Sequence, residues 1–366
     1  MILKDMLGVE ISSATARRCA EQHGKRYEDV QTAAVTAIET QLPDPPQGPT
    51  KQLLSVDGAY VPLVHGQWVE VKTLTIGVIE EPVLEKGEWV VHSTGLSYFS
   101  RWTEADSFAR LALVETQRRG VETAERVLSP TDGAVWIQGF LDYHRRDAER
   151  ILDFGHAAEY VARIGRVVGE PDSAAFQAWL SCNLHALKHE GGTAVLPELR
   201  AQVTAHPDQP ELAAALAYLE NRVAMMNYPE YQRQGWPIGS GSAESANKVV
   251  VEARMKGAGM HWAPHHVNPM LSLRGAVCSD RWAEAWQDIA THHQQQQRQR
   301  YLERARLRTL VPLPPPLPSA PASPAPPSEA QASPTAPKEP WRPAPDHPWR
   351  RSLGPTSSRR SPFAEK

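Results

Sequence analysis

Apolar residues dominate the stretch from Leu53 to Leu63, where Leu54 and Val56 leave little room for a solvent-exposed face. This pattern predicts a strand buried in the centre of a sheet. Asp57 interrupts the apolar run, and an ionised carboxylate is costly there unless a partner, a metal ion or a substrate compensates its charge. Because Asp-Gly is also a common hairpin dipeptide, a turn at Asp57-Gly58 is the alternative.

Apolar runs and helical periodicities follow one another along the first half of the chain, which predicts an α/β domain built on a mixed sheet. Turn residues separate the predicted elements. We expect strands over residues 53–63, 67–79, 88–99, 125–128, 135–137 and 151–154, and helices over residues 103–120 and 146–150.

The second half of the chain changes character twice. Residues 157–230 show no strand pattern and are Ala- and Leu-rich near their end, which predicts a helical insertion between two parts of the α/β domain. Beyond residue 310 the chain holds 17 of its 32 prolines, a composition that predicts disorder. We therefore expect a first part of the domain (51–156), the insertion (157–235), a C-terminal part (236–310) and a disordered Pro-rich tail (311–366).

The N-terminal residues 1–41 have the pattern of an incomplete helix-turn-helix unit, and a Pro-rich linker over 42–50 follows them. Gly8-Val9 suggests a turn, Ser12 or Ser13 can cap a helix, and Arg17 and Arg18 lie on its polar face. The first helix of such a unit would precede Met1, so we expect only part of it here. An ordinary amphipathic helix is the alternative.

Charge and cysteine usage limit the classes of function. The net charge of −3 gives no global basic field, although residues 222–310 carry 12 Lys and Arg against 7 Asp and Glu. The three cysteines are far apart, which argues against structural zinc and disulfides and favours a reducing compartment. The sequence has no signal-peptide pattern and no apolar run of membrane-spanning length, so we expect a cytoplasmic protein without a membrane partner.

Three acidic residues lie where predicted elements begin or end. Asp57 is in the first strand, Asp153 ends the predicted strand 151–154, and Glu244 lies in the first turn of a helix behind the Gly-Ser segment 239–242. Each has a structural alternative: Asp153 can cap the following helix, and Glu244 can pair with Lys248 one turn later.

Three carboxylates without Cys or His ligands are suited to Mg²⁺ or Mn²⁺. Two such ions about 4 Å apart can activate a water or a 3′-hydroxyl and stabilise the leaving oxygen of a phosphodiester. This chemistry requires the acids to converge at one cleft, so we expect Asp57, Asp153 and Glu244 to meet there.

Four stretches carry a resemblance to a known family. They are Val56–Ala59, Ile151–Ala157, Gly239–Lys248 and Arg254–Trp262. Together they resemble the DDE-type transposases of bacterial insertion sequences, in particular the ISKra group, which is related to the Mutator-like superfamily. The Asp-x-x-His form at Asp153–His156 and a helical insertion between the second and third acids are both features of that superfamily. The resemblance covers about residues 1–290.

The resemblance implies an RNase H-like fold with Asp57, Asp153 and Glu244 as catalytic, metal-binding residues, and His156 beside the second acid as a phosphate contact. It also implies metal-dependent DNA strand cleavage and strand transfer during transposition, with Mg²⁺ or Mn²⁺ as cofactor. The expected partners are the DNA of the element ends and of the target, together with further copies of the chain in a synaptic complex. The expected location is the bacterial nucleoid.

Further basic residues are candidates for phosphate contacts: Lys248, Arg254 and Lys256 on the third-acid helix, with Arg17 and Arg18 near the N-terminus. Two other functions stay open. One is a catalytically inactive DNA-binding remnant of a decayed element, and the other is an RNase H-like nuclease or junction resolvase that cleaves branched DNA without needing element ends.

Overall fold

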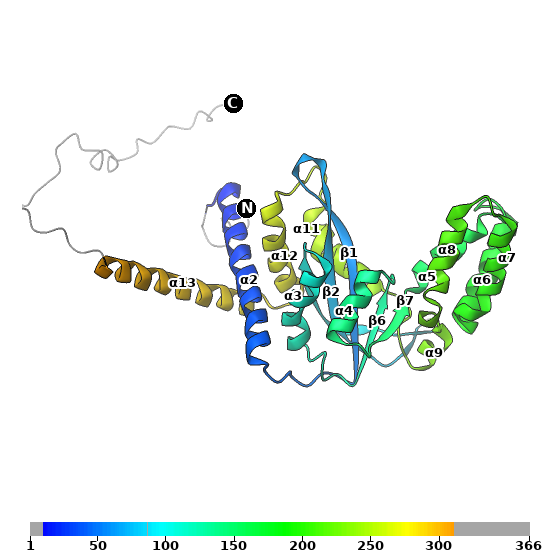
Figure 1. The fold of residues 1–366 in the computed structure, drawn as a ribbon, viewed down its shortest axis with the longest axis horizontal. Coiled ribbons are helices and arrows are strands. Elements are labelled where there is room, and N and C mark those ends of the chain that lie inside the picture. The colour runs from blue at the N-terminus through cyan, green and yellow to red at the C-terminus, as the bar shows by residue number, and fades with distance from the viewer. Residues whose placement is uncertain (1–9, 86, 311–366) are drawn as a thin grey trace, which may run out of the picture. The chain divides into compact units, whose positions relative to one another are not determined.

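The computed structural model describes residues 10–85 and 87–310, and its centre is a five-stranded mixed sheet (Figure 1). The strands lie in the order β5-β2-β1-β6-β7. β2 pairs antiparallel with both β1 and β5, whereas β6 and β7 run parallel to β1. Their bounds are Lys51–Pro62 (β1), Trp68–Ile79 (β2), Ser93–Arg101 (β5), Arg126–Thr131 (β6) and Glu149–Leu152 (β7). The predicted mixed α/β architecture is confirmed.

β1 is the central strand, as the apolar run predicts. Asp57 and Gly58 continue inside it, opposite Thr73 and Lys72 of β2. The alternative of a hairpin turn at this dipeptide is therefore wrong, because the strand extends to Pro62.

The two faces of β1 are covered by different helices. Leu54 and Val56 pack with helices α3 (Ala105–Arg118) and α4 (Val135–His144). Alternate residues point to opposite faces of a strand, so Asp57 shares its face with Leu53 and Ala59. Leu53 belongs to the cluster formed with the helical insertion, and Ala59 to the cluster formed with the C-terminal helices. Asp57 thus lies between two hydrophobic clusters.

Two short elements differ from the sequence prediction. Residues 135–137 begin helix α4 and not a strand, because Ile137, Phe140 and Leu141 recur at helical spacing and are buried together. The helix expected over 146–150 is absent, and Glu149–Leu152 forms β7. The strand expected over 88–99 is also divided: β4 (Glu88–Val90) pairs with β3 (Val83–Glu85), and β5 begins at Ser93.

Residues 157–235 contain helices and no strand. The helices are α5 (Phe154–Gly165), α6 (Ala174–Glu190), α7 (Gly192–Ala205), α8 (Pro210–Glu220), the short η2 (Val223–Met225) and α9 (Tyr228–Arg233). α6, α7 and α8 contact α5, which follows β7 directly. The ends of this block are held together, because Phe154 N donates to Ile238 O at 2.9 Å and Tyr228 Oη to Leu152 O at 2.9 Å.

The N-terminal part of the chain forms one long helix, α2 (Ser13–Gln41), and the described residues 10–41 contain no other helix. Ser12 caps it by accepting from Thr15 N at 3.1 Å. α2 packs beside α12 (Pro264–Cys278) and α3 (Figure 1). At the closest point a Cβ on Gly24 would lie 2.4 Å from Pro269 O. Residues 42–50 contain neither helix nor strand.

The C-terminal part returns to the sheet as a sequence of helical segments. α10 (Gly241–Ala246), the π-helical segment η3 (Asn247–Glu252) and α11 (Ala253–Met255) follow one another without a break, and α12 and α13 (Trp282–Leu310) come next. η3 contacts β1, and its Val250 and Val251 are buried beneath Ala59 and Val61. The Pro-rich tail expected over 311–366 lies outside the described residues.

Candidate active site

Asp57 is a half-buried carboxylate with two hydrogen-bond partners. Its Oδ1 accepts from Gly58 N at 2.7 Å, and its Oδ2 accepts from Asn247 Nδ2 at 2.9 Å. Burial raises the pKa of Asp57, and the neighbouring charge of Asp132 raises it further, while the two hydrogen bonds and the charge of His156 act in the opposite direction. The carboxylate therefore lies in a place where added positive charge would be favourable.

A further acidic residue, Asp132, lies near Asp57 and is not among the three acids predicted from the sequence. It follows β6 directly, and its Oδ1 accepts from Ala134 N at 2.9 Å in a tight turn. The parallel register pairs Leu53 with Leu128, and Ser55 Oγ donates to Pro130 O at 2.6 Å at the same spacing.

Two residues beyond Ser55 and Pro130, the same register places Asp132 opposite Asp57. The sequence did contain a signal for Asp132: it is an acid placed directly after a buried apolar run. The carboxyl ends of parallel strands lie at the same edge of a sheet, and ligands commonly bind there. The tetrapeptide 130–133 instead indicated only a turn.

Asp153 has a different environment. It is the N-cap of α5 and only 4% exposed, and its Oδ1 accepts from His156 N at 2.8 Å and from His156 Nδ1 at 3.1 Å. Its Oδ2 accepts from Ser240 N. Burial opposes its ionisation, but the hydrogen bonds from His156 and Ser240 outweigh burial and hold the pKa of Asp153 at about 2. The capping alternative thus describes what Asp153 does, and both of its oxygens have protein donors.

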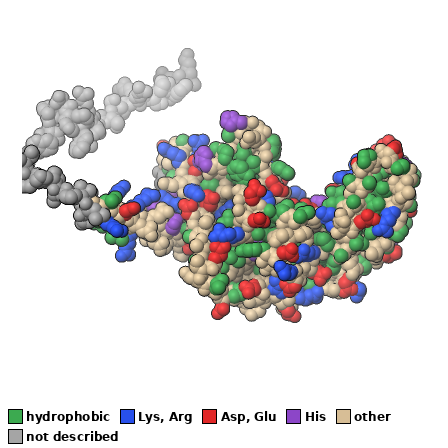
Figure 2. All heavy atoms as spheres, in the orientation of Figure 1, with side chains coloured by type: hydrophobic (Ala, Val, Ile, Leu, Met, Phe, Trp, Pro, Cys, Tyr) green, Lys and Arg blue, Asp and Glu red, His purple; other side chains and the backbone are tan. Residues whose placement is uncertain are grey.

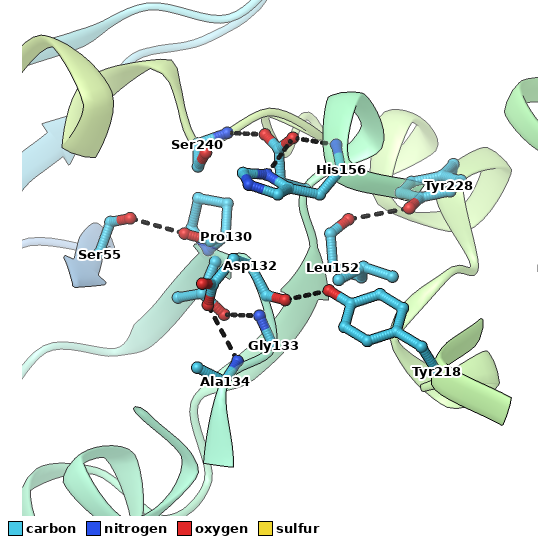
Figure 3. A network of polar contacts seen from close by, with 12 residues as sticks. Ser55, Pro130, Asp132, Gly133, Ala134, Leu152, His156, Tyr218, Tyr228 and Ser240 are labelled. Carbon is cyan, nitrogen blue, oxygen red and sulfur yellow. Dashed lines mark hydrogen bonds and ion pairs between the residues drawn. The ribbon is translucent and has the colours of Figure 1, made fainter. Parts of the chain in front are cut away.

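His156 is a fixed positive charge beside the acids. The hydrogen bond to Asp153 raises the pKa of His156 to about 9, against the effect of burial, and the charges of Asp153 and Asp132 contribute. Figure 3 shows His156 with Ser240 and Asp132 where β6 and β7 end. The imidazolium of His156 balances part of the negative charge of Asp153 and Asp132.

Two tyrosines of the insertion complete this network. Tyr218 Oη donates to Asp132 O and Tyr228 Oη donates to Leu152 O (Figure 3). The hydrogen bonds join backbone carbonyls at the ends of the strands to helices α8 and α9. The positions of Asp132 and Asp153 therefore depend on the insertion as well as on the sheet.

Glu244 lies in α10 and is exposed, with no side-chain hydrogen bond or ion pair among the described residues. The alternative of an ion pair with Lys248 is not formed, and Ser240 occupies the N-cap position of α10 without a side-chain capping bond. One turn after Glu244, Asn247 makes the contact with Asp57. The helical segment that carries Glu244 thus reaches Asp57 through Asn247, while the Glu244 carboxylate makes no hydrogen bond or ion pair with another side chain of the described residues.

The basic candidates fall into two groups. Lys248 and Arg254 lie on the helical segments after Glu244, and Lys256 directly follows the last of them. Lys248 is exposed, the Arg254 guanidinium lies 5.1 Å from the centre of the Trp262 ring, and Lys256 is paired with Glu252 at 2.7 Å. The other group, Arg17 and Arg18, is exposed on α2, where Arg17 lies 3.6 Å from Glu21.

The face of the molecule drawn in Figure 2 shows no extended basic surface. Across the described residues of the face drawn there, positive and negative side chains are interspersed. Any nucleic-acid contact on that face therefore depends on individual residues.

The donor set fits a hard divalent cation in part. Mg²⁺ is commonly held by one or two carboxylates and completes its coordination with waters and substrate phosphates. Asp57 and Asp132 supply two such carboxylates. Burial and the charge of Asp132 raise the pKa of Asp57, and a bound cation would offset both effects by stabilising the ionised carboxylate. Within residues 10–85 and 87–310, however, no three His, Cys, Asp or Glu side chains are grouped closely enough to hold a metal ion on their own.

No protein-family model matches this sequence, and no curated protein sequence matches it. Across the described part of the chain, no helix combines the length and apolar character needed to cross a membrane.

Proposed function

We propose that this protein is a metal-dependent transposase of the DDE type, which cleaves and rejoins DNA phosphodiesters with Asp57, Asp132 and Glu244 as its acidic residues. The observation that carries the proposal is the strand register, which places Asp132, directly after the parallel strand β6, opposite Asp57 of β1. The proposal replaces Asp153 by Asp132 as the second acid and gives Asp153 the role of orienting His156.

An RNase H-like fold is part of the proposal. Three strands run antiparallel in the order β5-β2-β1, two parallel strands follow in the order β6-β7, and a later helix contacts β1. This arrangement allows residues from three separate elements to act on one substrate, because the sheet and the packed helix hold them rigidly.

The chemistry assigned to the residues follows from their environments. Asp57 and Asp132 would hold Mg²⁺ or Mn²⁺, which activates the attacking oxygen and stabilises the leaving one. Glu244, which is exposed and makes no side-chain hydrogen bond or ion pair within residues 10–85 and 87–310, would be the third acidic residue. His156, held protonated by Asp153, would contact the phosphate next to the scissile bond. Lys248 and the other basic candidates would contact more distant phosphates.

The partners proposed here follow from the resemblance to insertion-sequence transposases: DNA at the element ends and in the target, and further copies of this chain in a synaptic complex. The same resemblance makes the bacterial nucleoid the proposed location.

Strand cleavage of supercoiled plasmid DNA tests the function. The plasmid carries the sequences that flank this gene, and the full-length protein is incubated with it in Mg²⁺ or Mn²⁺. The proposal expects nicked or linear DNA with the wild type and none with Asp57→Asn. Asp172→Asn, at an exposed position outside the site, is the matched control. DNA binding without any cleavage would instead support the inactive remnant, and cleavage confined to branched DNA would support the resolvase.

A further inference from the structure

Asn247 is a buried amide at the junction of α10 and η3. It is 5% exposed and begins the π-helical segment, one turn after Glu244. π-helical turns within helices are rare and frequently occur at functional sites. Asn247 lies within the stretch 239–248 that carries the resemblance, but no role is assigned to its side chain there or in the proposed mechanism.

The two polar atoms of Asn247 differ in their surroundings. Nδ2 donates to Asp57 Oδ2 at 2.9 Å, across 190 residues of sequence. Oδ1 is buried and has no hydrogen-bond partner. Leaving a buried acceptor unsatisfied costs about 1–3 kcal/mol. Such an atom is usually explained by a ligand, an ion or a water at that position.

The position of Asn247 Oδ1 indicates which kind of ligand it could bind. Both atoms belong to one planar amide, so Oδ1 lies next to the hydrogen bond that Nδ2 makes to Asp57. The carboxylate that Asn247 contacts is Asp57, and the strand register places the carboxylate of Asp132 opposite Asp57. Amide carbonyl oxygens are accepted ligands of hard divalent cations, and a neutral one adds an oxygen without adding repulsion between carboxylates.

We propose that Asn247 is a metal ligand of this site, with Oδ1 as a neutral oxygen donor to the divalent cation held by Asp57 and Asp132. Nδ2 at the same time fixes the orientation of the Asp57 carboxylate. The inference rests on the proposed function, because it assumes that Asp57 binds a cation. It also gives the third-acid helix a direct part in cation binding.

Mn²⁺ binding to the full-length protein, measured by electron paramagnetic resonance without DNA, tests the inference. Asn247→Leu removes both polar atoms at similar volume, and we expect it to weaken Mn²⁺ binding by at least about tenfold. Asn247→Asp keeps an oxygen donor, and we expect it to bind Mn²⁺ as tightly as the wild type or more tightly. Thermal unfolding of each variant shows whether it is folded, and Asn247→Ser replaces the leucine variant if that one is not.

The outcomes separate the two proposals. Mn²⁺ binding that depends on Asp57 but is equal in the wild type and Asn247→Leu overturns the role of Asn247 alone. Equal binding, or no binding, in the wild type and Asp57→Asn overturns the metal site itself, and with it the proposed function. A loss in Asn247→Leu that is restored in Asn247→Asp supports the assignment.

Discussion

Asp132, directly after β6, lies opposite Asp57 of β1 in the strand register, and burial together with the charge of Asp132 raises the pKa of Asp57. Two carboxylates in this arrangement repel each other when no cation is bound. A cation bound between them would attract both and offset the repulsion. Sites of this kind are kept for function at some cost in stability, because a structural role alone would favour separation of the charges.

Asp132→Asn should abolish DNA cleavage while leaving the fold intact. The asparagine retains an oxygen that can accept from Ala134 N, so the turn after β6 is preserved, and one of two like charges is removed. We expect at least about a 100-fold loss of cleavage rate. The melting temperature should stay the same or rise. Plasmid nicking and thermal unfolding measure the two effects, and undiminished cleavage would return the second-acid role to Asp153.

Asp153→Ala should act first on stability. The substitution removes the N-cap of α5, the ion pair with His156 and the acceptor of Ser240 N. Loss of a capping residue costs about 1–2 kcal/mol, and we expect a decrease in the free energy of unfolding at the upper end of that range. Denaturant unfolding measures it, with Asp172→Ala as the control. A variant as stable as the wild type would show that Asp153 is not a structural residue.

The Asp153–His156 pair should give stability a defined pH window. The pKa of His156 is raised from 6.5 to about 9, so its contribution is complete below pH 6.5 and is lost as the pH rises through 9. The pKa of Asp153 is lowered from 3.8 to about 2, so its contribution is complete above pH 3.8 and is lost as the pH falls through 2. The pair therefore stabilises most between these limits.

Nuclear magnetic resonance of the His156 ring protons measures this directly. In the wild type the ring should titrate well above pH 6.5, and in Asp153→Asn its pKa should fall towards the ordinary value because the principal cause of the shift is removed. An unchanged titration in the variant would mean that Asp153 is not what holds the proton on His156.

Gly24→Ala should destabilise the packing of α2 against α12. An added Cβ would lie 2.4 Å from Pro269 O, which is backbone and cannot rotate away. Overpacking of this kind costs about 1–3 kcal/mol, which exceeds the gain in helix propensity. Ala33→Ser, at an exposed position of the same helix, is the control. If Gly24→Ala unfolds at the same denaturant concentration as the wild type, α2 is not firmly packed on the domain.

Long patterns in the sequence were sufficient for the main elements. The apolar run around Leu54 and Val56 predicts the central strand because burial on both faces leaves few positions for polar residues. Ser12 predicts the start of α2 because only a few side chains can accept from the first free N–H groups of a helix. The helical periodicity of 157–230 persists over enough turns to exclude strands.

Short elements, and the pairing of strands that are distant in sequence, could not be predicted from local sequence patterns. Val135-Trp136-Ile137 is compatible with either a strand or a helix, and only burial of Phe140 with Ile137 distinguishes them. β7 has four residues and begins with Glu149-Arg150, a pair that favours a helix in isolation. Asp132 was missed because its position beside Asp57 depends on which strand pairs with β1, and no residue close to it in sequence encodes that pairing.

The segment between β7 and α10 begins and ends at one place on the sheet. Hydrogen bonds from Phe154 to Ile238 and from Ser240 to Asp153 hold its two ends together. A segment whose two ends lie side by side can be lengthened, shortened or replaced without changing the order or pairing of the strands. The exchange has one constraint: any replacement must again supply hydroxyl donors for the carbonyls of Asp132 and Leu152, since Tyr218 and Tyr228 supply them here. A segment of different length or sequence at this point would leave Asp57 and Asp132 in place on the sheet.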